Sequence, residues 1–341
     1  MPLVDVASDF RPMCPTPMID SVSIRNFKCL RSVDVELEPL TVLIGKNDTG
    51  KSSFLEALTF FVAAFGETDE TPNPQVTHGV NPTDLAVSVR LDGQDYSAGL
   101  KGGQGVFGGG SAQIHTNSES DGRLPLRSVR SPYRLDPDRL RMPAQVGVLN
   151  GPLPARGDHL VAALDRLPLS RMVQLQKELI ARVPTVRELV LVPHQTGSKE
   201  ITFDLASGGR IPAKAASDGV MLLLAYLAIM FDENAPGLIM IEEPENGIHP
   251  KQLEYVVKQL LSLTQREEPV QVIMTTHSPY VLDFVPKESV RVFARNESGD
   301  VEVEPFADIE GIADMLSSGY TLGEVWYNTD EDELIRRSGG G

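Results

Sequence analysis

Alternation of apolar and polar residues marks the first regular structure of the chain. Residues 21–27 and 31–37 alternate like two neighbouring half-buried strands. Residues 40–44, apolar except for Thr41, are typical of a fully buried strand. Apolar residues then recur with a helical period over about 51–66, and residues 85–91 predict another strand. The chain therefore opens as a strand-rich unit in which a buried strand leads directly into a helix.

The pattern then weakens before helical periodicity returns. Residues 71–84 are rich in Pro and Asn and predict a loop. Residues 102–121 are rich in Gly and Ser with few large apolar side chains, which predicts a mobile loop or insertion. A helical period resumes over roughly 157–183.

Strand and core-helix patterns fill the last part of the chain. A hairpin is predicted from 186–192 to 200–205, with its turn near Gly197. The most apolar run, 220–231, is too short to span a bilayer and predicts a buried core helix. A further hairpin is predicted around 297–300, followed by short helices.

Composition narrows the class of protein. A chain of 341 residues with 41% hydrophobic content can form one large α/β domain or a core with an inserted lobe. Cys14 and Cys29 are too few for a disulfide framework and lack metal-ligand spacing. The N-terminus lacks the basic start and apolar stretch of a secretory signal, so a reducing cytoplasm is expected.

The formal net charge of −16 argues against a surface that binds nucleic acid over its whole extent. A local exception lies between residues 121 and 141, where arginines outnumber acidic residues. Its arginines are Arg123, Arg127, Arg130, Arg134, Arg139 and Arg141. Two interpretations remain open: a solvated or intramolecularly paired surface, and a patch that contacts phosphates or a partner.

A phosphate-binding loop follows the first buried strand. The motif is Gly45-x-x-x-x-Gly50-Lys51-Ser52, in which the glycines allow backbone N–H groups to surround the phosphates. Lys51 would reach the β- and γ-phosphate oxygens and Ser52 would ligate Mg²⁺. The nucleotide-binding candidates are Gly45, Lys46, Asn47, Asp48, Thr49, Gly50, Lys51, Ser52 and Ser53. The motif predicts binding of ATP or GTP, with the following helix directing its positive N-terminus at the anion.

Two later strands end in residues suited to phosphate chemistry. The apolar run 238–241 leads into Glu242, which could hold Mg²⁺ through water, and Glu243, which could act as general base toward the attacking water. The alternative is a strand that ends in solvated acids. The apolar strand 272–276 leads into His277, which could hydrogen-bond the γ-phosphate. A lone histidine there could instead be a satisfied core or cap residue.

Ser217, Asp218 and Gly219 open the apolar helix that follows them. One interpretation is a helix cap, in which Ser217 or Asp218 accepts from the free N–H groups. The other is a binding loop that offers those N–H groups and the Ser217 hydroxyl to a γ-phosphate held by another subunit.

These motifs in this order resemble the ABC-type ATPase heads of the SMC, RecF and OLD branch. The similarity is strongest to the compact AAA-named ATPases and extends over about 21–326, from Ile24-Arg-Asn-Phe-Lys-Cys-Leu-Arg31 to Leu322-Gly-Glu-Val-Trp326. The resemblance implies ATP and Mg²⁺ as cofactors. It also implies an α/β P-loop NTPase fold of ABC type, with a mixed-sheet core, an antiparallel β subdomain and a helical or irregular lobe between Walker A and the signature.

The resemblance also implies a role for each matching residue. Gly45, Gly50, Lys51 and Ser52 would form Walker A. Glu242 would be the Walker B acid and metal ligand, Glu243 the catalytic base and His277 the switch histidine. Ser217, Asp218 and Gly219 would form the signature loop, and residues 246–249 the D-loop. Lys28 occupies a position where related DNA-repair heads have a basic phosphate contact; a surface lysine is the equal alternative.

The domain organisation implied is an irregular lead-in over 1–20, an ATPase domain over 21–334 and a disordered tail over 335–341. Within the ATPase domain, lobe I would comprise about 21–100 and 232–334. The signature lobe would comprise about 124–231, with a flexible insertion at about 101–123.

Some residues depart from the family pattern. Glu242 stands where Walker B usually has Asp, and the signature reads Ala-Ser-Asp-Gly in place of Leu-Ser-Gly-Gly. The Q-loop could be at Gln75 or Gln145. Too few residues separate Walker A from the signature for coiled-coil arms, and too few follow His277 for a Toprim domain. We therefore expect a head that does not cut DNA by itself.

The resulting expectation is a cytoplasmic, Mg²⁺-dependent ATPase in which two copies sandwich ATP and each signature loop completes the partner's site. The resemblance favours a role in DNA maintenance or anti-phage defence through a separately encoded effector, for which a nuclease is one candidate. DNA is a candidate ligand, and no membrane partner is expected. Two alternatives remain: the ATPase subunit of a membrane transporter, and a slow ATP-gated scaffold or sensor.

Overall fold

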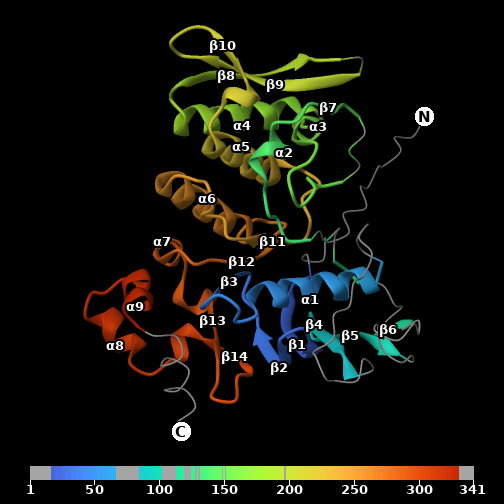
Figure 1. The fold of residues 1–341 in the computed structure, drawn as a ribbon, viewed down its shortest axis with the longest axis vertical. Helices are drawn as coiled ribbons and strands as arrows, with labels where there is room; N and C mark the ends of the chain where they lie inside the picture. The colour runs from blue at the N-terminus through green and yellow to red at the C-terminus, as the bar shows by residue number, and fades with distance from the viewer. Residues whose placement is uncertain are drawn as a thin grey trace, which may run out of the picture.

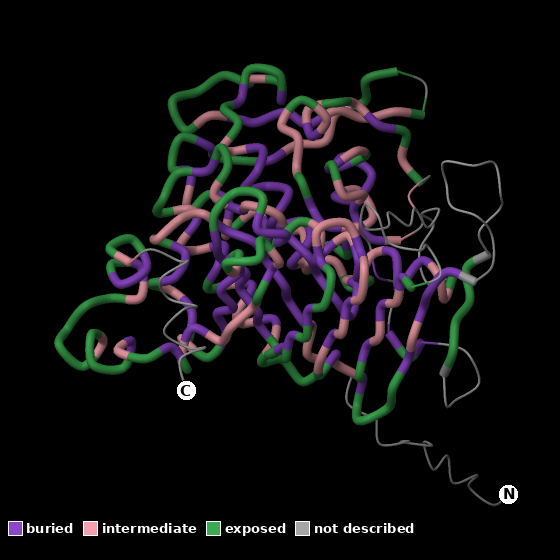
Figure 2. Tube along the Cα trace, turned by 60° about the horizontal axis from the view of Figure 1, so that its bottom comes forward, coloured by how far each residue is buried: buried purple, intermediate pink, exposed green. Residues whose placement is uncertain are grey.

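The computed structural model describes residues 17–66, 84–101, 113–118, 124–126, 129, 131–147, 149, 151–195 and 197–329. These residues form three sheets (Figure 1). A small antiparallel sheet lies at one end of the molecule and two five-stranded sheets lie toward the other, with α5 (Asp218–Phe231) and α6 (Pro250–Leu263) between them. Buried backbone gathers in the interior, and exposed backbone follows the periphery (Figure 2).

The central sheet has the strand order β11-β12-β3-β13-β14. Its strands are β11 (Leu238–Glu242), β12 (Gln271–Thr275), β3 (Leu40–Ile44), β13 (Val290–Arg295) and β14 (Val301–Pro305). The first four run parallel, and β14 pairs antiparallel with β13 as the predicted final hairpin. Parallel strands covered on both faces are mostly apolar, as β3 is apart from Thr41. Their carboxyl ends share one edge, so the loops after β3, β11 and β12 converge there.

The outer sheet is antiparallel, in the order β2-β1-β4-β5-β6. Its strands are β1 (Ile19–Phe27), β2 (Leu30–Glu36), β4 (Ala86–Leu91), β5 (Gln94–Lys101) and β6 (Gln113–Ser118). Helix α1 (Lys51–Ala64) packs between this sheet and the central one, because its buried Phe54 and Phe61 belong to one apolar cluster with residues of both sheets. The first helix is thereby fixed relative to the strand that precedes it.

Gln271, the first residue of β12, joins the two large sheets. Its side-chain Oε1 accepts from the Ile19 N–H at 2.9 Å, and its Nε2 donates to the Ile19 carbonyl at 2.8 Å. Nε2 also donates to the Glu38 carbonyl at 3.3 Å. Gln271 is 1% exposed, so these bonds satisfy an amide that has almost no access to water.

The distal sheet is built around β9. Its strands are β7 (Ala144–Gln145), β8 (Val186–Pro193), β9 (Ser198–Leu205) and β10 (Arg210–Pro212), and β9 pairs antiparallel with each of the others. The hairpin predicted for 186–192 and 200–205 is confirmed as β8–β9. Its turn contains Gly197 with φ +75°, a conformation that glycine adopts without strain.

The single helical period predicted over 157–183 is divided into α3 (Leu160–Asp165) and α4 (Leu169–Arg182). The division falls at Leu167 and Pro168. Proline lacks the N–H that would continue the first helix, and it disfavours helical backbone in the residue before it. Pro168 instead becomes the N-cap residue of α4.

Helix α5 is buried on nearly every side, as predicted for a core helix. All residues from Met221 to Met230 are buried, and the helix contacts α4 and α6. The remaining helices are short: α2 (Pro137–Leu140), α7 (Pro279–Leu282), α8 (Ile312–Ser317) and α9 (Leu322–Asn328). The short helices predicted near the C-terminus are therefore present as α8 and α9.

The flexible insertion expected at 101–123 needs correction. Strand β6 lies inside it and pairs with β5, which also ends inside it, in a continuous antiparallel register from Tyr96–Ser118 to Lys101–Gln113. Apart from Ile114, the residues of β6 are polar and form no apolar face, so the sequence carried no strand pattern. The expected loop at 71–83, most of the lead-in and the tail over 335–341 lie outside the described residues. Across the described chain, no helix is long and apolar enough to cross a membrane.

Candidate functional site

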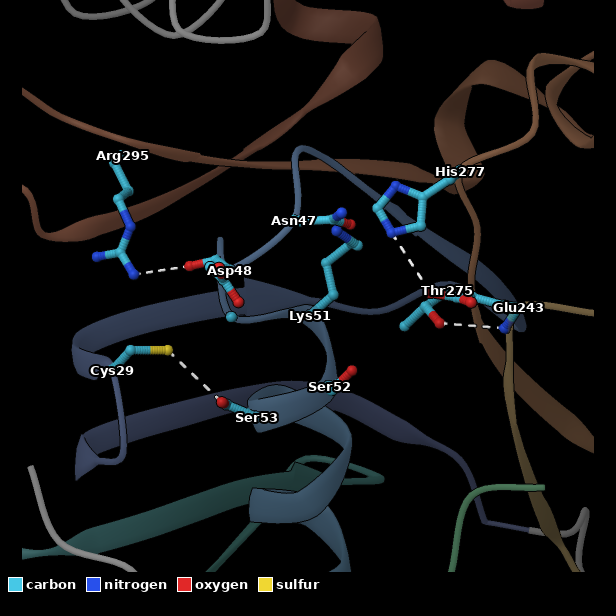
Figure 3. A pocket seen from close by; sticks show the side chains of 11 residues that line it. Cys29, Asn47, Asp48, Lys51, Ser52, Ser53, Glu243, Thr275, His277 and Arg295 are labelled. Carbon is cyan, nitrogen blue, oxygen red and sulfur yellow. Dashed lines mark hydrogen bonds and ion pairs between the residues drawn. The ribbon is translucent and has the colours of Figure 1, made fainter. Parts of the chain in front are cut away.

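A pocket of about 490 Å³ lies at the carboxyl edge of the central sheet. It receives side chains from the loops after β3, β11 and β12, and from the end of β13 (Figure 3). The lining residues are Cys29, Asn47, Asp48, Gly50, Lys51, Ser52, Ser53, Glu243, Thr275, His277 and Arg295. Eight of the residues predicted from sequence thus surround one cavity: Asn47, Asp48, Gly50, Lys51, Ser52, Ser53, Glu243 and His277.

The loop between β3 and α1 requires its glycines. Gly45 has φ +143°, and a Cβ there would lie 2.1 Å from the Phe293 carbonyl oxygen of β13. Gly50 has φ +97°, and a Cβ there would lie 2.6 Å from Leu30 Cδ2. Thr49 is buried and donates from Oγ1 to the Lys46 carbonyl at 2.8 Å. Gly45, Lys46 and Thr49 therefore shape the loop without lining the pocket.

Lys51 is the first residue of α1 and is 6% exposed. Its Nζ donates to the carbonyl oxygens of Gly45 at 2.7 Å and Lys46 at 2.8 Å. These bonds hold the ammonium group inside the turn of the loop, close to Asn47 and His277 (Figure 3). A cation and a helix N-terminus at the same place favour an anion.

Glu242 ends β11 and faces Ser52. Ser52 Oγ lies 3.5 Å from Glu242 Oε2. Glu242 lines a second pocket of about 400 Å³, which shares Ser52 and Glu243 with the first. A hydroxyl and a carboxylate on facing loops are oxygen donors of the kind that Mg²⁺ prefers, with phosphate and water supplying the rest. The residues present therefore fit a magnesium ion bound together with a nucleotide.

Arg134 also contacts Glu242, and the sequence did not single it out as a site residue. Its Nε lies 2.5 Å from Glu242 Oε2, and its Nη2 donates to Oε1 at 2.6 Å. Arg134 stood only among the arginines of 121–141, and no local pattern distinguished it from them. Its position beside β11 depends on a long-range bridge between Tyr133 and Ile241.

Glu243 has an unusual backbone. Its φ is +47°, although it has a side chain and precedes Pro244. Its N–H donates to the Thr275 carbonyl at 3.0 Å, which fixes this turn to β12. Non-glycine residues in this conformation are strained and tend to occur at functional sites.

The Glu243 carboxylate is oriented by two neighbours. Asn246 Nδ2 donates to Oε2 at 2.6 Å, and His277 Nε2 lies 3.4 Å from Oε1. Burial and the nearby Lys51 ammonium lower the pKa of His277, and the carboxylates of Glu243 and Glu245 oppose that shift. The imidazole is therefore neutral at pH 7, and it can donate or accept a hydrogen bond.

Glu245 fixes the turn that carries His277. Its Oε1 accepts from the His277 N–H at 2.7 Å and from Thr276 Oγ1 at 2.9 Å. A carboxylate that accepts two hydrogen bonds in a partly buried position restrains both donors. The loop after β11 thus positions the residue that follows β12.

The predicted signature residues lie apart from the pocket of their own chain. Ser217 is the N-cap residue of α5, but its side chain makes no capping hydrogen bond. Asp218 forms an ion pair with Arg141. Gly219 lies beside the D-loop position, since a Cβ there would be 3.5 Å from the Gly247 carbonyl oxygen. The cap interpretation is therefore wrong for Ser217, because its hydroxyl does not satisfy the helix.

The described arginines of 121–141 are paired within the chain. Arg139 pairs with Asp136 and Asp158, while Arg141 pairs with Asp138 and Asp218. Together with Arg134, these residues confirm the interpretation of an intramolecularly paired surface for this part of the stretch. Arg123, Arg127 and Arg130 lie outside the described residues.

Two further sequence candidates lie away from the pocket lining. Lys28 forms an ion pair with Glu56 of α1, and burial together with the charge of Arg134 lowers its pKa. Gln145 is exposed in β7 of the distal sheet and lines neither pocket. Gln75 lies outside the described residues. The sequence also missed Arg295, which lines the pocket and donates to the Asp48 carbonyl at 2.6 Å.

Comparison with known families and proteins gives consistent matches. The family described as "AAA domain, putative AbiEii toxin, Type IV TA system" matches residues 40–283. An OLD nuclease of Thermus scotoductus is 22% identical over 93% of this chain and 70% of its own length. An uncharacterised protein of Methanocaldococcus jannaschii is 41% identical, over 16% of this chain and 24% of its own length.

Solved structures of SMC heads share the fold. One, the Smc head bound to the C-terminal winged-helix domain of ScpA, has a TM-score of 0.57 at 12% identity and covers 84% of this chain and 96% of its own. Another, an Smc head with an extended coiled coil bound to the C-terminal domain of ScpA from Pyrococcus furiosus, has a TM-score of 0.51 at 11% identity, with the same coverage of 84% and 96%.

Proposed function

We propose that this chain hydrolyses ATP with Mg²⁺, because it belongs to the AAA-domain family whose model matches residues 40–283. It is an ATP-binding head of the ABC, SMC and OLD type. One observation carries this proposal. Lys51, Glu243 and His277 come from three separate loops and line the same pocket at the carboxyl edge of the parallel strands. Phosphate binding alone would not require a carboxylate and a neutral imidazole beside the lysine.

Each site residue has a separate role in the proposed hydrolysis. Backbone N–H groups of the loop and Lys51 bind the phosphates, while Ser52 and Glu242 would hold Mg²⁺, which neutralises phosphate charge. Glu243 accepts a proton from the water whose oxygen attacks the γ-phosphorus, and the bond from that phosphorus to the β,γ-bridging oxygen breaks. Asn246 keeps the Glu243 carboxylate aimed by donating to its Oε2. The single N–H of the neutral His277 would donate a hydrogen bond to the γ-phosphate when nucleotide is bound.

We also propose that two copies close around ATP. The N-terminus of α5 lies outside its own chain's pocket, and its Ser217 hydroxyl makes no capping bond. A second copy could present this N-terminus to the γ-phosphate, which would then be bound by both chains. ATP would stabilise the closed pair through that shared contact, and hydrolysis would release it.

Turnover and oligomeric state test both proposals together. Glu243→Gln is expected to lower kcat by about 10²- to 10⁴-fold and to trap a dimer in the presence of Mg–ATP. Lys51→Ala should neither bind ATP tightly nor dimerise. The measurements are steady-state phosphate release and light scattering after size-exclusion chromatography with and without ATP. Glu254→Gln, at a half-buried position on α6 whose carboxylate pairs with Lys258 away from the pocket, is the control and should match the wild type. Equal elution of the Glu243 and Lys51 variants with ATP would contradict the shared site.

For the biological role, we propose that the ATP cycle acts on a separately encoded effector in DNA maintenance or anti-phage defence. The support is the similarity to a relative that is named as an OLD nuclease. A membrane-transporter subunit and a slow ATP-gated scaffold or sensor remain the alternatives.

The role is tested by ATP turnover with and without double-stranded DNA over a salt series, and by comparing proteins that co-purify with the Glu243→Gln and Lys51→Ala variants. An effector specific to the ATP-trapped variant is the expected result, and DNA stimulation that weakens with salt would add DNA as a ligand. Association with membranes would favour the transporter, and negligible turnover under every condition would favour the scaffold. No difference between the variants would contradict effector coupling.

A further inference from the structure

Arg134 is carried by a segment that extends the central sheet at β11. The Tyr133 N–H donates to the Met240 carbonyl at 2.8 Å, and the Glu242 N–H donates to the Tyr133 carbonyl at 2.9 Å. Tyr133 thereby forms a parallel bridge with Ile241, next to the last residue of β11. This pairing fixes the backbone of Arg134 beside Glu242. The Arg134 side chain can therefore contact the Glu242 carboxylate on the neighbouring strand.

The guanidinium group contacts both oxygens of Glu242: Nη2 donates to Oε1 at 2.6 Å, and Nε forms an ion pair with Oε2 at 2.5 Å. A contact of one guanidinium with both oxygens of a carboxylate is charge-assisted and geometrically specific. The Glu242 side chain is 10% exposed, so water solvates its negative charge only weakly. Arg134 Nη2 also lies 3.7 Å from Glu56 of α1, which places the cation between two carboxylates that flank Ser52.

Both oxygens of Glu242 are thus occupied by Arg134, on the side chain that also faces Ser52. Resting on the proposed Mg–ATP site, we propose that Arg134 is a positioning residue that competes with Mg²⁺ for Glu242. Without metal, the guanidinium neutralises the carboxylate. When Mg²⁺ arrives with the nucleotide, Glu242 exchanges the guanidinium for the metal and its water, and Arg134 leaves.

Release of Arg134 from Glu242 would also affect the segment that carries Arg134, outside the pocket. The Arg134 N–H donates to the Ala155 carbonyl at 2.9 Å, and the Asp136 N–H donates to the Arg156 carbonyl at 3.1 Å. The same short segment therefore pairs with β11 on one side and with the stretch that leads to α3 on the other. Loss of the Glu242 contact removes one of the bonds by which this segment is tied to the nucleotide site.

The test compares ATP affinity with Mg²⁺ and with EDTA, by titration calorimetry, in the wild type and in Arg134→Gln. The ratio of the Kd in EDTA to the Kd in Mg²⁺ is expected to rise at least about fivefold in the variant. Without Arg134, the uncompensated Glu242 carboxylate repels the phosphates of metal-free ATP, which raises the Kd in EDTA. Mg²⁺ also no longer competes with a guanidinium for Glu242, which lowers the Kd in Mg²⁺. Arg90→Gln, which removes an exposed arginine paired with Asp95 on the outer sheet, is the matched control and should keep the wild-type ratio.

The outcomes separate the possible failures. An unchanged ratio, with both Kd values shifted equally, would mean that Arg134 is only structural and would overturn the proposal. A lower ratio, caused by weaker Mg–ATP binding, would also overturn it by assigning Arg134 to the phosphates. If Arg134→Gln does not fold, Arg134→Lys keeps the charge but loses the paired bonds, and a ratio raised about twofold is expected. Equal ATP binding by the wild type and Lys51→Ala would refute the proposed function itself.

Discussion

His277 lies between a cation and a carboxylate, and its protonation state decides how it can act. Protonation would place a second positive charge near Lys51 in a half-buried position, which the lowered pKa reflects. Attraction to Glu243 and Glu245 does not outweigh these two effects. The neutral form can therefore accompany Glu243 without forming an ion pair that would weaken it as a base.

We expect the pKa of His277 to lie below the ordinary value of 6.5, and to rise in Lys51→Met because the repelling ammonium is removed. Turnover should be constant near neutral pH and should fall as the pH drops through the lowered pKa, where the imidazolium forms. Titration of the imidazole by NMR between pH 4.5 and about 8 measures the pKa without relying on activity. A value above 6.5 in the wild type, or no rise in the variant, would show that burial and Lys51 do not control it.

At this scale, the sequence predicted residues whose chemistry is attached to a local motif. Lys51, Glu243 and His277 each follow an apolar strand, and the structure brings all three to one pocket. Arg134 and Arg295 reach the site through contacts across more than a hundred residues of chain, to Glu242 and to the Asp48 carbonyl. No spacing rule links residues so far apart. The catalytic, metal-binding and signature roles assigned from sequence remain predictions.

Helix α5 is the element that connects the pocket side of the molecule to the distal sheet. Its N-terminus carries Ser217–Gly219, and its buried body contacts α2, α3, α4 and α6. Because the helix is apolar on all sides, its position depends on packing and not on charged pairs along a solvent face. Any change at its core positions is expected to affect the whole fold.

Leu224→Ala, at a residue with 0% exposure in the middle of α5, should lower the free energy of unfolding by about 2–5 kcal/mol. The cost combines lost burial with the cavity left among neighbouring helices. Leu169→Ala, on α4, is the matched control: its side chain is 80% exposed, and the change should be within about 0.5 kcal/mol. Urea denaturation followed by circular dichroism measures both. Similar losses in the two variants would contradict the packing argument.

Element prediction succeeded for the long apolar helices α1 and α5 and for the short buried strand β3. It failed at the boundary of α3 and α4, where a helical period continued across Leu167 and the backbone restriction imposed by Pro168 prevailed. It also failed at β6, whose exposed residues gain their conformation from pairing with β5 and not from burial. Edge strands of this kind carry little hydrophobic pattern.

At the scale of the whole molecule, the order of motifs along the chain indicated which loops would meet. Strands β3, β11 and β12 are parallel neighbours in one sheet, so residues that follow them share an edge regardless of their separation in sequence. The family and the ABC-type fold are confirmed by the match over 40–283 and by the Smc head structures. The boundaries of the lobes and the pairing of two copies remain predictions, because they depend on surfaces that no sequence pattern specifies.

Gln271 has a consequence for how this architecture comes apart. Its carboxamide presents a donor and an acceptor to the backbone of Ile19, as a peptide group would. It thereby links two sheets between which the described strands form no pairing. Separating the sheets would leave that amide and the Ile19 peptide groups unpaired in an apolar interior. The nucleotide-binding strands and the outer sheet should therefore unfold as a single cooperative unit. No partly unfolded state is expected in which β1 is unfolded while the phosphate loop remains folded.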